Sequence, residues 1–209
     1  MHVRWSHDAP RPDTNLVVFL HGFGADENDL LPLGNYFDEN RYTIASVQAP
    51  KALPPHFGGY CWFPISTTLE ANVDEIRAAV VQLDEWVQSV AKNYRSVSLL
   101  GFSQGMAMAT SLMRMRPGAY PAVVGLSGFV IEAAELDDLF KDAEFAASNQ
   151  PVFWGYDPAD PIVAADRIQQ TGDWLRPRVN LVEKTFRGVG HGIHPQEISD
   201  FLAFLNQHV

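Results

Sequence analysis

The sequence predicts an α/β fold with a mostly parallel central sheet and helices on both of its faces. Short apolar runs alternate with helical patterns along the chain, and this alternation is typical of βαβ units. Of the 209 residues, 46% are hydrophobic and 19% are charged, which suffices for one sizeable core but not for two large domains. We therefore expect residues 1–209 to form a single domain.

Six short apolar runs predict the strands of this sheet. The clearest is Leu16–Leu20, an unbroken apolar run that suits a strand covered on both faces. The other five are Tyr42–Val47, Ser96–Leu100, Ala122–Leu126, Pro151–Trp154 and Arg178–Thr185.

The strongest helical pattern lies between Ala71 and Lys92, where apolar residues recur at spacings of three and four. A second helix follows Gly105 and ends before Pro117 and Gly118. Because this second helix is apolar on nearly all sides, we expect it to be buried. Four further helices are predicted at Asn28–Phe37, Glu132–Phe145, Ile162–Leu175 and Pro195–Gln207.

The charge balance and the cysteine content exclude several classes of protein. The formal net charge is -10, with 15 Lys and Arg against 25 Asp and Glu, and would repel a nucleic acid backbone. The single cysteine, Cys61, cannot form an internal disulfide and is expected to be a small buried residue. The sequence has neither a metal-ligand cluster nor a phosphate-binding glycine loop, so no metal or cofactor is expected.

Hydropathy gives no sign of a membrane segment. No apolar run approaches the roughly 18 to 20 residues that span a bilayer. The first 15 residues also lack the pattern of a secretory signal. We expect a soluble, cytoplasmic protein without stable insertion into a membrane.

Residues Gly101–Gly105 match the pattern G-x-S-x-G, between a predicted strand and the predicted buried helix. In that context the central residue, Ser103, occupies a sharp turn, and glycines two positions away avoid a collision with the backbone. Ser103 would also lie at the amino end of a helix, where developing negative charge is stabilised. The pattern therefore predicts a nucleophilic serine, the alternative being a serine that caps the helix between two turn glycines.

A serine nucleophile needs an imidazole to take its proton and a carboxylate to orient that imidazole. Among the 7 histidines, His191 alone has glycines on both sides in a loop after the last predicted strand. His194 precedes Pro195 and is expected to cap the last helix. Two carboxylates, Asp157 and Asp160, follow the preceding strand, and the residues alone leave open which of them is the acid. The alternative role for each is that of a residue in a local Asx turn.

Four blocks of the sequence together resemble the phospholipase/carboxylesterase family, which includes acyl-protein thioesterases and bacterial carboxylesterases. The resemblance implies an α/β-hydrolase fold in its compact version without a large cap domain, and it implies Asp160 as the triad acid. In two places the sequence departs from the family pattern, with Met106 in place of a second glycine and Trp154-Gly155 in place of His-Gly. The four blocks are His21-Gly22-Phe23-Gly24-Ala25-Asp26, Gly101-Phe102-Ser103-Gln104-Gly105, Asp160-Pro161-Ile162-Val163 and Gly190-His191-Gly192.

Two backbone N–H groups are needed to stabilise the oxygen of a tetrahedral intermediate. By position, Gln104 supplies the donor after the nucleophile and Phe23 the donor after an early strand, and the resemblance implies the same pair. Gly22 and Gly24 would allow this loop to approach the serine closely. The alternative for the loop is a simple turn at the end of a strand.

The stretch from Ala49 to Thr68 is irregular and rich in proline, glycine and aromatic residues, so it predicts a long loop. Its Trp62 and Phe63 either line an acyl-binding groove, as the resemblance implies, or simply pack on the core.

Together these residues predict a serine carboxylesterase that hydrolyses small esters with an apolar acyl group through an acyl-enzyme on Ser103. Thioester or lysophospholipid substrates, acyl transfer by the same triad, a non-catalytic binding protein on the same fold, and a homodimer all stay open.

Overall fold

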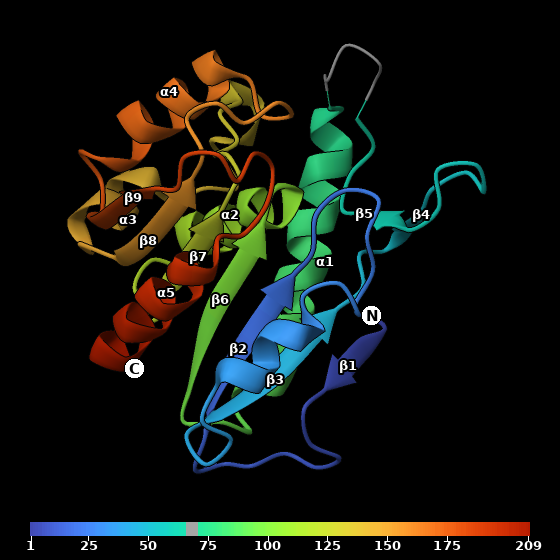
Figure 1. The fold of residues 1–209 in the computed structure, drawn as a ribbon, viewed down its shortest axis with the longest axis vertical. Helices are drawn as coiled ribbons and strands as arrows, with labels where there is room; N and C mark the ends of the chain where they lie inside the picture. Colours follow the sequence, from blue (N-terminus) through green and yellow to red (C-terminus); the bar gives the residue numbers. More distant parts are fainter. Residues whose placement is uncertain (66–70) are drawn as a thin grey trace.

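The computed structural model describes residues 1–65 and 71–209. Within these residues, seven strands form one sheet in the order β1-β3-β2-β6-β7-β8-β9. Every neighbouring pair in it is parallel except β1 and β3, which are antiparallel (Figure 1). The strands are β1 (Val3–Trp5), β2 (Asn15–Leu20), β3 (Tyr42–Val47), β6 (Ser96–Phe102), β7 (Val123–Leu126), β8 (Pro151–Tyr156) and β9 (Asn180–Thr185).

All six predicted strands are present in this sheet, with small differences at their ends. The edge strand β1 was not predicted, because its three residues carry no pattern of their own and are held by pairing with β3, as in Val3 opposite Val47. The predicted loop contains a small hairpin of β4 (Lys51–Ala52) and β5 (Tyr60–Cys61). The end of that predicted loop, residues 66–68, lies outside the described residues.

Five α-helices and two 3₁₀ segments are found among residues 1–65 and 71–209. The α-helices are α1 (Val73–Ala91), α2 (Gln104–Met115), α3 (Asp142–Ala147), α4 (Ala165–Leu175) and α5 (Pro195–His208). The 3₁₀ segments are η1 (Leu31–Tyr36) and η2 (Ala134–Leu136).

Three of the predicted helices differ from the structure for local physical reasons. Asn28–Phe37 contains only η1, because Pro32 and Gly34 oppose a longer α-helix. The predicted helix from Glu132 to Phe145 is split into η2 and α3, and Lys141 N donates at its break to Arg114 O, 3.0 Å away. Helix α4 begins at Ala165 rather than Ile162, since the Ile162 amide donates to a side chain instead.

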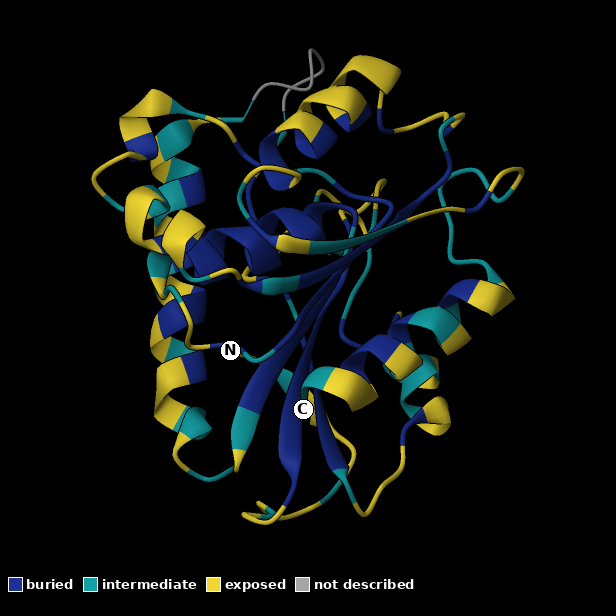
Figure 2. Cartoon of the chain, turned by 90° about the vertical axis from the view of Figure 1, so that its left-hand side faces the viewer, coloured by how far each residue is buried: buried dark blue, intermediate teal, exposed yellow. Residues whose placement is uncertain are grey.

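The helices cover both faces of the sheet. One core cluster packs α1, α2, α3 and α4 on one face, and a second packs η1 and α5 on the other (Figure 1). The central strands are buried along almost their whole length, and α2 is buried on nearly all sides, as predicted. Helices α1, α4 and α5 are each buried on one side only and are exposed on the other (Figure 2). In the part of the chain that the structure describes, none of the helices is long and apolar enough to cross a membrane.

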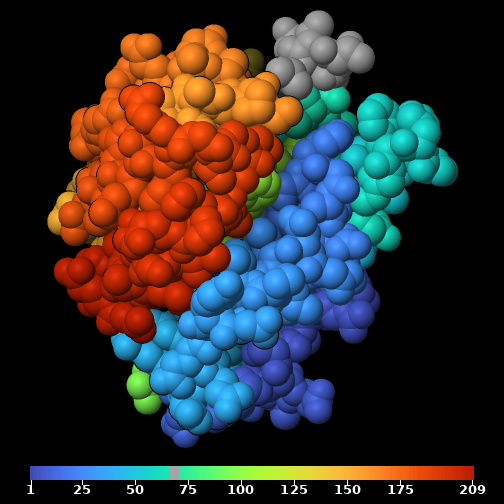
Figure 3. All heavy atoms as spheres, viewed as in Figure 1, coloured from blue at the N-terminus to red at the C-terminus, as the bar shows by residue number. Residues whose placement is uncertain are grey.

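The parallel registers bring the loops that follow the strands to one edge of the sheet. Leu20 at the end of β2 pairs with Gly101 in β6, and Leu126 at the end of β7 pairs with Gly155 in β8. Residues just beyond these positions therefore meet at the carboxyl edge, where ligands bind in open α/β sheets. In Figure 3, residues from the middle of the chain, coloured green, reach the surface between the red C-terminal and the blue N-terminal segments.

Candidate active site

Ser103 occupies a strained turn between β6 and α2. Its backbone has φ 54° and ψ -118°, a conformation that residues with a side chain rarely adopt. Ser103 N donates to Leu126 O at 2.9 Å, which ties the turn to the neighbouring strand. The helix α2 that follows receives no capping hydrogen bond from the Ser103 side chain, so the helix-cap alternative does not describe this serine.

The two glycines that flank the turn are required by close backbone contacts. A Cβ on Gly101 would lie well inside 3.0 Å of the Gly105 backbone, closer than real Cβ atoms approach. A Cβ on Gly105 would overlap the carbonyl group of Leu20 in β2 in the same way. The glycine spacing thus lets β2, β6 and α2 pack tightly behind the serine.

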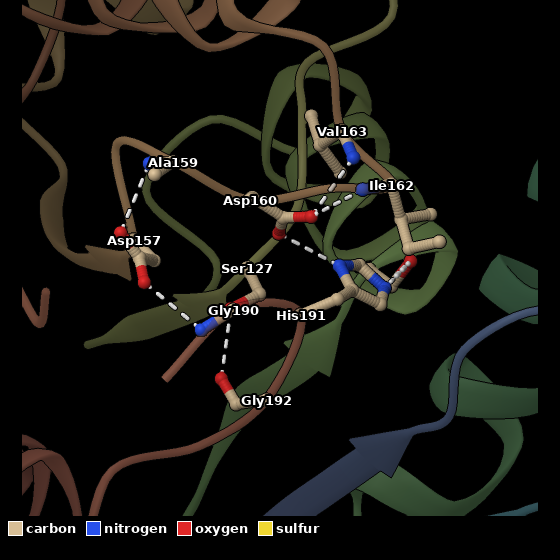
Figure 4. Close-up of polar contacts among 10 residues, drawn as sticks. Ser127, Asp157, Ala159, Asp160, Ile162, Val163, Gly190, His191 and Gly192 are labelled. Atoms are coloured by element: carbon tan, nitrogen blue, oxygen red, sulfur yellow. Dashed lines mark hydrogen bonds and ion pairs between the residues drawn. The ribbon is translucent and has the colours of Figure 1, made fainter. Parts of the chain in front are cut away.

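His191 links Ser103 to Asp160. Its Nε2 lies 3.0 Å from Ser103 Oγ, and its Nδ1 lies 2.7 Å from Asp160 Oδ2 (Figure 4). A carboxylate accepts, so Nδ1 carries the proton, and Nε2 is left to accept the hydroxyl hydrogen of Ser103. The side chain of Asp160 is 1% exposed and that of His191 is 18% exposed.

Asp160 is held in place by its other carboxylate oxygen. Oδ1 accepts from Ile162 N at 2.7 Å and from Val163 N at 3.0 Å (Figure 4). This leaves Oδ2 directed at the imidazole. Of the two carboxylates that the sequence left open, the structure places Asp160 against His191.

Asp157 makes different contacts. Its Oδ1 accepts from Ala159 N at 2.9 Å, and its Oδ2 accepts from Gly188 N at 2.7 Å and Gly190 N at 2.9 Å. These N–H donors hold the pKa of the Asp157 carboxyl below its usual range. The N–H of Ala159 has the largest effect and that of Gly190 the next largest. The contact with Ala159 N agrees with the Asx-turn alternative for Asp157. Sequence reasoning did not find its contacts with Gly188 and Gly190.

The loop after β2 lies next to the nucleophile. A Cβ on Gly22 would be 3.3 Å from Ser103 Cβ and 3.1 Å from Phe102 Cδ1, so a side chain there would crowd the site. Among the hydrogen bonds of the described residues, none begins at the backbone N–H of Phe23 or Gln104. Both predicted donors are therefore unpaired within that part of the chain.

His21 orients the peptide that carries the Phe23 N–H. Ala49 N donates to His21 Nε2 at 3.0 Å, so the proton of the neutral ring is on Nδ1, which donates to Gly22 O at 2.7 Å. Burial lowers the pKa of His21 and favours this neutral ring. Gly22 C=O and Phe23 N–H belong to one planar peptide, so fixing the carbonyl fixes the donor. This role was not found from the sequence, although the histidine stood in a motif.

Trp62 and Phe63 are core residues in this structure, 0% and 2% exposed. Trp62 Nε1 donates to His21 O at 2.9 Å. The Gln104 side chain accepts from Trp62 N at 2.9 Å and donates to Phe63 O at 2.7 Å. This placement agrees with core packing, not with the groove wall, because the side chains present no surface to a bound acyl group.

Met106 stands where the family pattern has a second glycine, and it fills space on the far side of the elbow. A Cβ on Gly125 or on Gly128 would meet Met106 atoms at 2.5 Å. The larger residue is therefore accommodated by two glycines at the end of β7.

His194, the other candidate histidine, is the N-cap of α5, with its side chain accepting from Gln196 N.

No group of three or more His, Cys, Asp or Glu side chains within residues 1–65 and 71–209 is arranged to hold a metal ion. The side chains that the structure brings together are the hydroxyl of Ser103, the imidazole of His191 and the carboxylate of Asp160.

This fold and this site define an α/β hydrolase, and comparison with known proteins places it more closely. Residues 7–209 match the model of the phospholipase/carboxylesterase family, so the chain belongs to that family and is an ester hydrolase. It is 28% identical over 207 residues to acyl-protein thioesterase 1 of Candida albicans, covering 90% of each chain.

Solved structures show the same fold. Esterase PE8 superposes with a TM-score of 0.81 at 22% identity, covering 99% of this chain and 98% of that one. The carboxylesterase of Bacillus cereus also has a TM-score of 0.81, at 18% identity, covering 99% of this chain and 94% of that one. At these identities the likeness concerns the fold alone.

Proposed function

We propose that this chain is a serine carboxylesterase that hydrolyses esters through an acyl-enzyme on Ser103. The observation that carries the proposal is the continuous hydrogen-bonded chain from Ser103 Oγ through His191 to Asp160. Its geometry meets the requirement that a weak nucleophile have a base in hydrogen-bond reach and that the base be oriented by a third group.

In the acylation step, Ser103 Oγ attacks the carbonyl carbon of the ester while its proton moves to His191 Nε2. The carbonyl oxygen of the substrate becomes negatively charged in the tetrahedral intermediate. When the bond to the leaving oxygen breaks, that oxygen takes the proton from Nε2, and the acyl group stays on Ser103. Asp160 stays ionised and stabilises the imidazolium that forms in between.

In the deacylation step, water attacks the acyl carbon and gives its proton to His191 Nε2. The bond to Ser103 Oγ then breaks, Oγ recovers the proton, and the carboxylic acid leaves. The same three side chains therefore serve both halves of the reaction.

The negative oxygen in both intermediates is assigned to the backbone N–H groups of Phe23 and Gln104. Gln104 is the first residue of α2, so its N–H has no partner within the helix and lies at the positive end of the helix dipole. Loss of one such donor typically costs about 3 kcal/mol in the transition state.

An apolar acyl group fits the exposed residues beside the site. Phe23, whose own N–H is one of the proposed donors, is 40% exposed. Ile162, whose N–H donates to Asp160, is 62% exposed. Exposed apolar side chains at this edge favour an apolar substrate over a charged one. The curated relatives named acyl-protein thioesterase 1 make a thioester of the same kind of acyl group the second substrate to test.

The test is labelling with a fluorophosphonate, followed by hydrolysis of p-nitrophenyl esters of increasing chain length. We expect wild-type protein to be labelled on Ser103 and Ser103→Ala to lose both labelling and hydrolysis. Ser89→Ala serves as the matched control, because Ser89 is an exposed serine of α1 whose hydroxyl donates to Trp86 O. A wild-type protein that neither labels nor hydrolyses any ester in the series would instead favour a non-catalytic binding protein.

A further inference from the structure

We propose that Asp157 is a positioning residue that holds the His191 loop and the Asp160 turn in one fixed arrangement. This inference rests on the proposed function. It gives Asp157 a supporting role in the site, without contact with the reacting atoms. Figure 4 shows Asp157 set apart from the line of contacts between Asp160 and His191.

The first anchor is between Asp157 and the loop that leads to His191. Gly188 and Gly190 have φ 87° and φ 64°, so the chain turns sharply through the left-handed region just before the histidine. The backbone N–H groups of both glycines point at one carboxylate oxygen, Asp157 Oδ2. Hydrogen bonds to an ionised acceptor are roughly twice as strong as neutral ones, so a buried carboxylate is well suited to fix such a turn.

The second anchor is between Asp157 and the turn that carries the acid. Ala159 N donates to Asp157 Oδ1, and Asp160 N donates to the Asp157 backbone carbonyl at 3.1 Å. One residue therefore sets the backbone on both sides of the bond between Asp160 and His191. Asp157 itself is 2% exposed, so water does not compete freely for its oxygens.

A third contact holds the loop beyond the histidine. Ser127 Oγ donates to Gly192 O at 2.9 Å, and Ser127 N donates to Gly155 O at 2.8 Å, which ties the loop to the ends of β7 and β8. His191 thus lies between one residue held by Asp157 and one held by Ser127 (Figure 4).

These anchors matter because His191 lies in neither a helix nor a strand. Its two ring nitrogens must stay within hydrogen-bond reach of Ser103 and Asp160 at the same time. A displacement of about 1 Å can lower the rate of an enzyme about 100-fold. Removing the acceptor for two loop N–H groups is expected to allow a displacement of that size.

The experiment compares Asp157→Asn and Asp157→Ala below the onset of thermal unfolding of each variant. We expect the fluorophosphonate labelling rate and kcat to fall about 10-fold in Asp157→Asn and about 100-fold in Asp157→Ala, with little change in KM. Asn can keep one of the two acceptor positions, whereas Ala keeps neither, so the order of the losses follows from the contacts. Ser127→Ala should give a smaller loss in the same direction.

A spectroscopic signature separates positioning from stability. The Nδ1 proton of His191, shared with a carboxylate, gives a low-field proton resonance, which should weaken in Asp157→Ala. Asp84→Asn is the control, since Asp84 is 2% exposed and accepts hydrogen bonds from Arg116, the C-cap residue of α2, away from the loop. It should lower thermal stability and leave both the labelling rate and the resonance unchanged.

The inference would be overturned if Asp157→Ala kept the fluorophosphonate labelling rate and the low-field proton resonance of the wild-type protein. It would also be overturned if Asp157→Asn lost as much activity as Asp160→Asn while keeping the resonance, because Asp157 would then act in the reaction itself. If wild-type protein fails to label, the proposed function fails, and the resonance still decides whether Asp157 positions His191. If Asp157→Ala does not fold, Asp157→Asn and Ser127→Ala carry the same comparison.

Discussion

The carboxyl group of Glu197 lies against Gly155, in the space that any side chain at position 155 would need. Glu197 is 0% exposed, and its Oε2 accepts from His194 N at 3.0 Å as part of the capping box of α5. Its Oε1 has no hydrogen-bond partner among the described residues. Burial raises the pKa of this carboxyl to about 7.

The raised pKa makes the stability of the protein depend on pH. An acid whose pKa is higher in the folded state stabilises the fold at low pH, and this contribution is lost as the pH rises from about 4.5 through about 7. Glu197→Gln removes the titrating group. The free energy of unfolding of the variant, relative to wild type, should therefore rise by about 2 to 3 kcal/mol between pH 5 and pH 8.

Urea unfolding at pH 5 and pH 8 checks this prediction. Glu144→Gln, at a position whose side chain is 68% exposed on α3, is the control and should show no comparable rise. A constant difference between wild type and Glu197→Gln across this range would contradict a raised pKa.

Gly105 is the least replaceable residue of the elbow. Because a Cβ would overlap the backbone of Leu20, Gly105→Ala must push α2 away from β2. We expect the free energy of unfolding to fall by about 3 kcal/mol or more, at the upper end of overpacking effects, and Ser103 labelling to be lost. Gly34→Ala is the matched control, since its Cβ would meet only Ile44 Cγ1, at an ordinary 3.7 Å. Equal thermal stability of the two variants would contradict this packing argument.

Asp160→Asn tests the assignment of the acid. The Asn side chain can still accept from Ile162 N and Val163 N, but its amide would face His191 Nδ1 and favour the wrong tautomer. We expect kcat to fall about 10⁴-fold with the thermal unfolding midpoint nearly unchanged. Near-normal turnover in Asp160→Asn, with turnover lost in Asp157→Asn, would reverse the assignment.

The Gln104 side chain should matter for stability more than for chemistry. Gln104→Met keeps the volume but leaves Trp62 N and Phe63 O without their partners in a buried place. We expect the free energy of unfolding, measured with a chemical denaturant, to fall by about 2 to 4 kcal/mol. The backbone N–H of residue 104 stays available to the tetrahedral intermediate. A loss below about 1 kcal/mol would mean that this loop is held by its apolar packing alone.

Phe23 should affect the choice of substrate, since its proposed donor is a backbone group and its side chain is exposed. Phe23→Ala is expected to keep most activity on short p-nitrophenyl esters and to lose about 10-fold in kcat/KM on long ones, as about 1 to 3 kcal/mol of apolar contact is removed. Tyr36→Ala, at a 61% exposed position of η1, is the control and should leave kcat/KM unchanged on both short and long esters. An equal loss on short and long esters would point to a disturbed loop instead.

Much of this fold could be predicted from the sequence, because a local pattern of apolar residues indicates a buried strand or an amphipathic helix. Each of the six predicted strands is present, as is the helix of regular spacing, α1. The predictions failed where distant contacts decide. Strand β1 exists only through its pairing with β3, and the break before α3 is bonded to Arg114 of α2.

The sequence by itself determined the elbow around Ser103, because glycine spacing and a strand-to-helix change are local properties. It also singled out His191 by its flanking glycines. Only the tertiary structure placed Asp160, and not Asp157, against His191, and only it placed Trp62 and Phe63 in the core. The physical reason is that the two carboxylates are chemically equal and lie three positions apart. What separates them is whether a carboxylate oxygen faces an imidazole or two loop N–H groups, which depends on how strands β8 and β9 bring the following loops together.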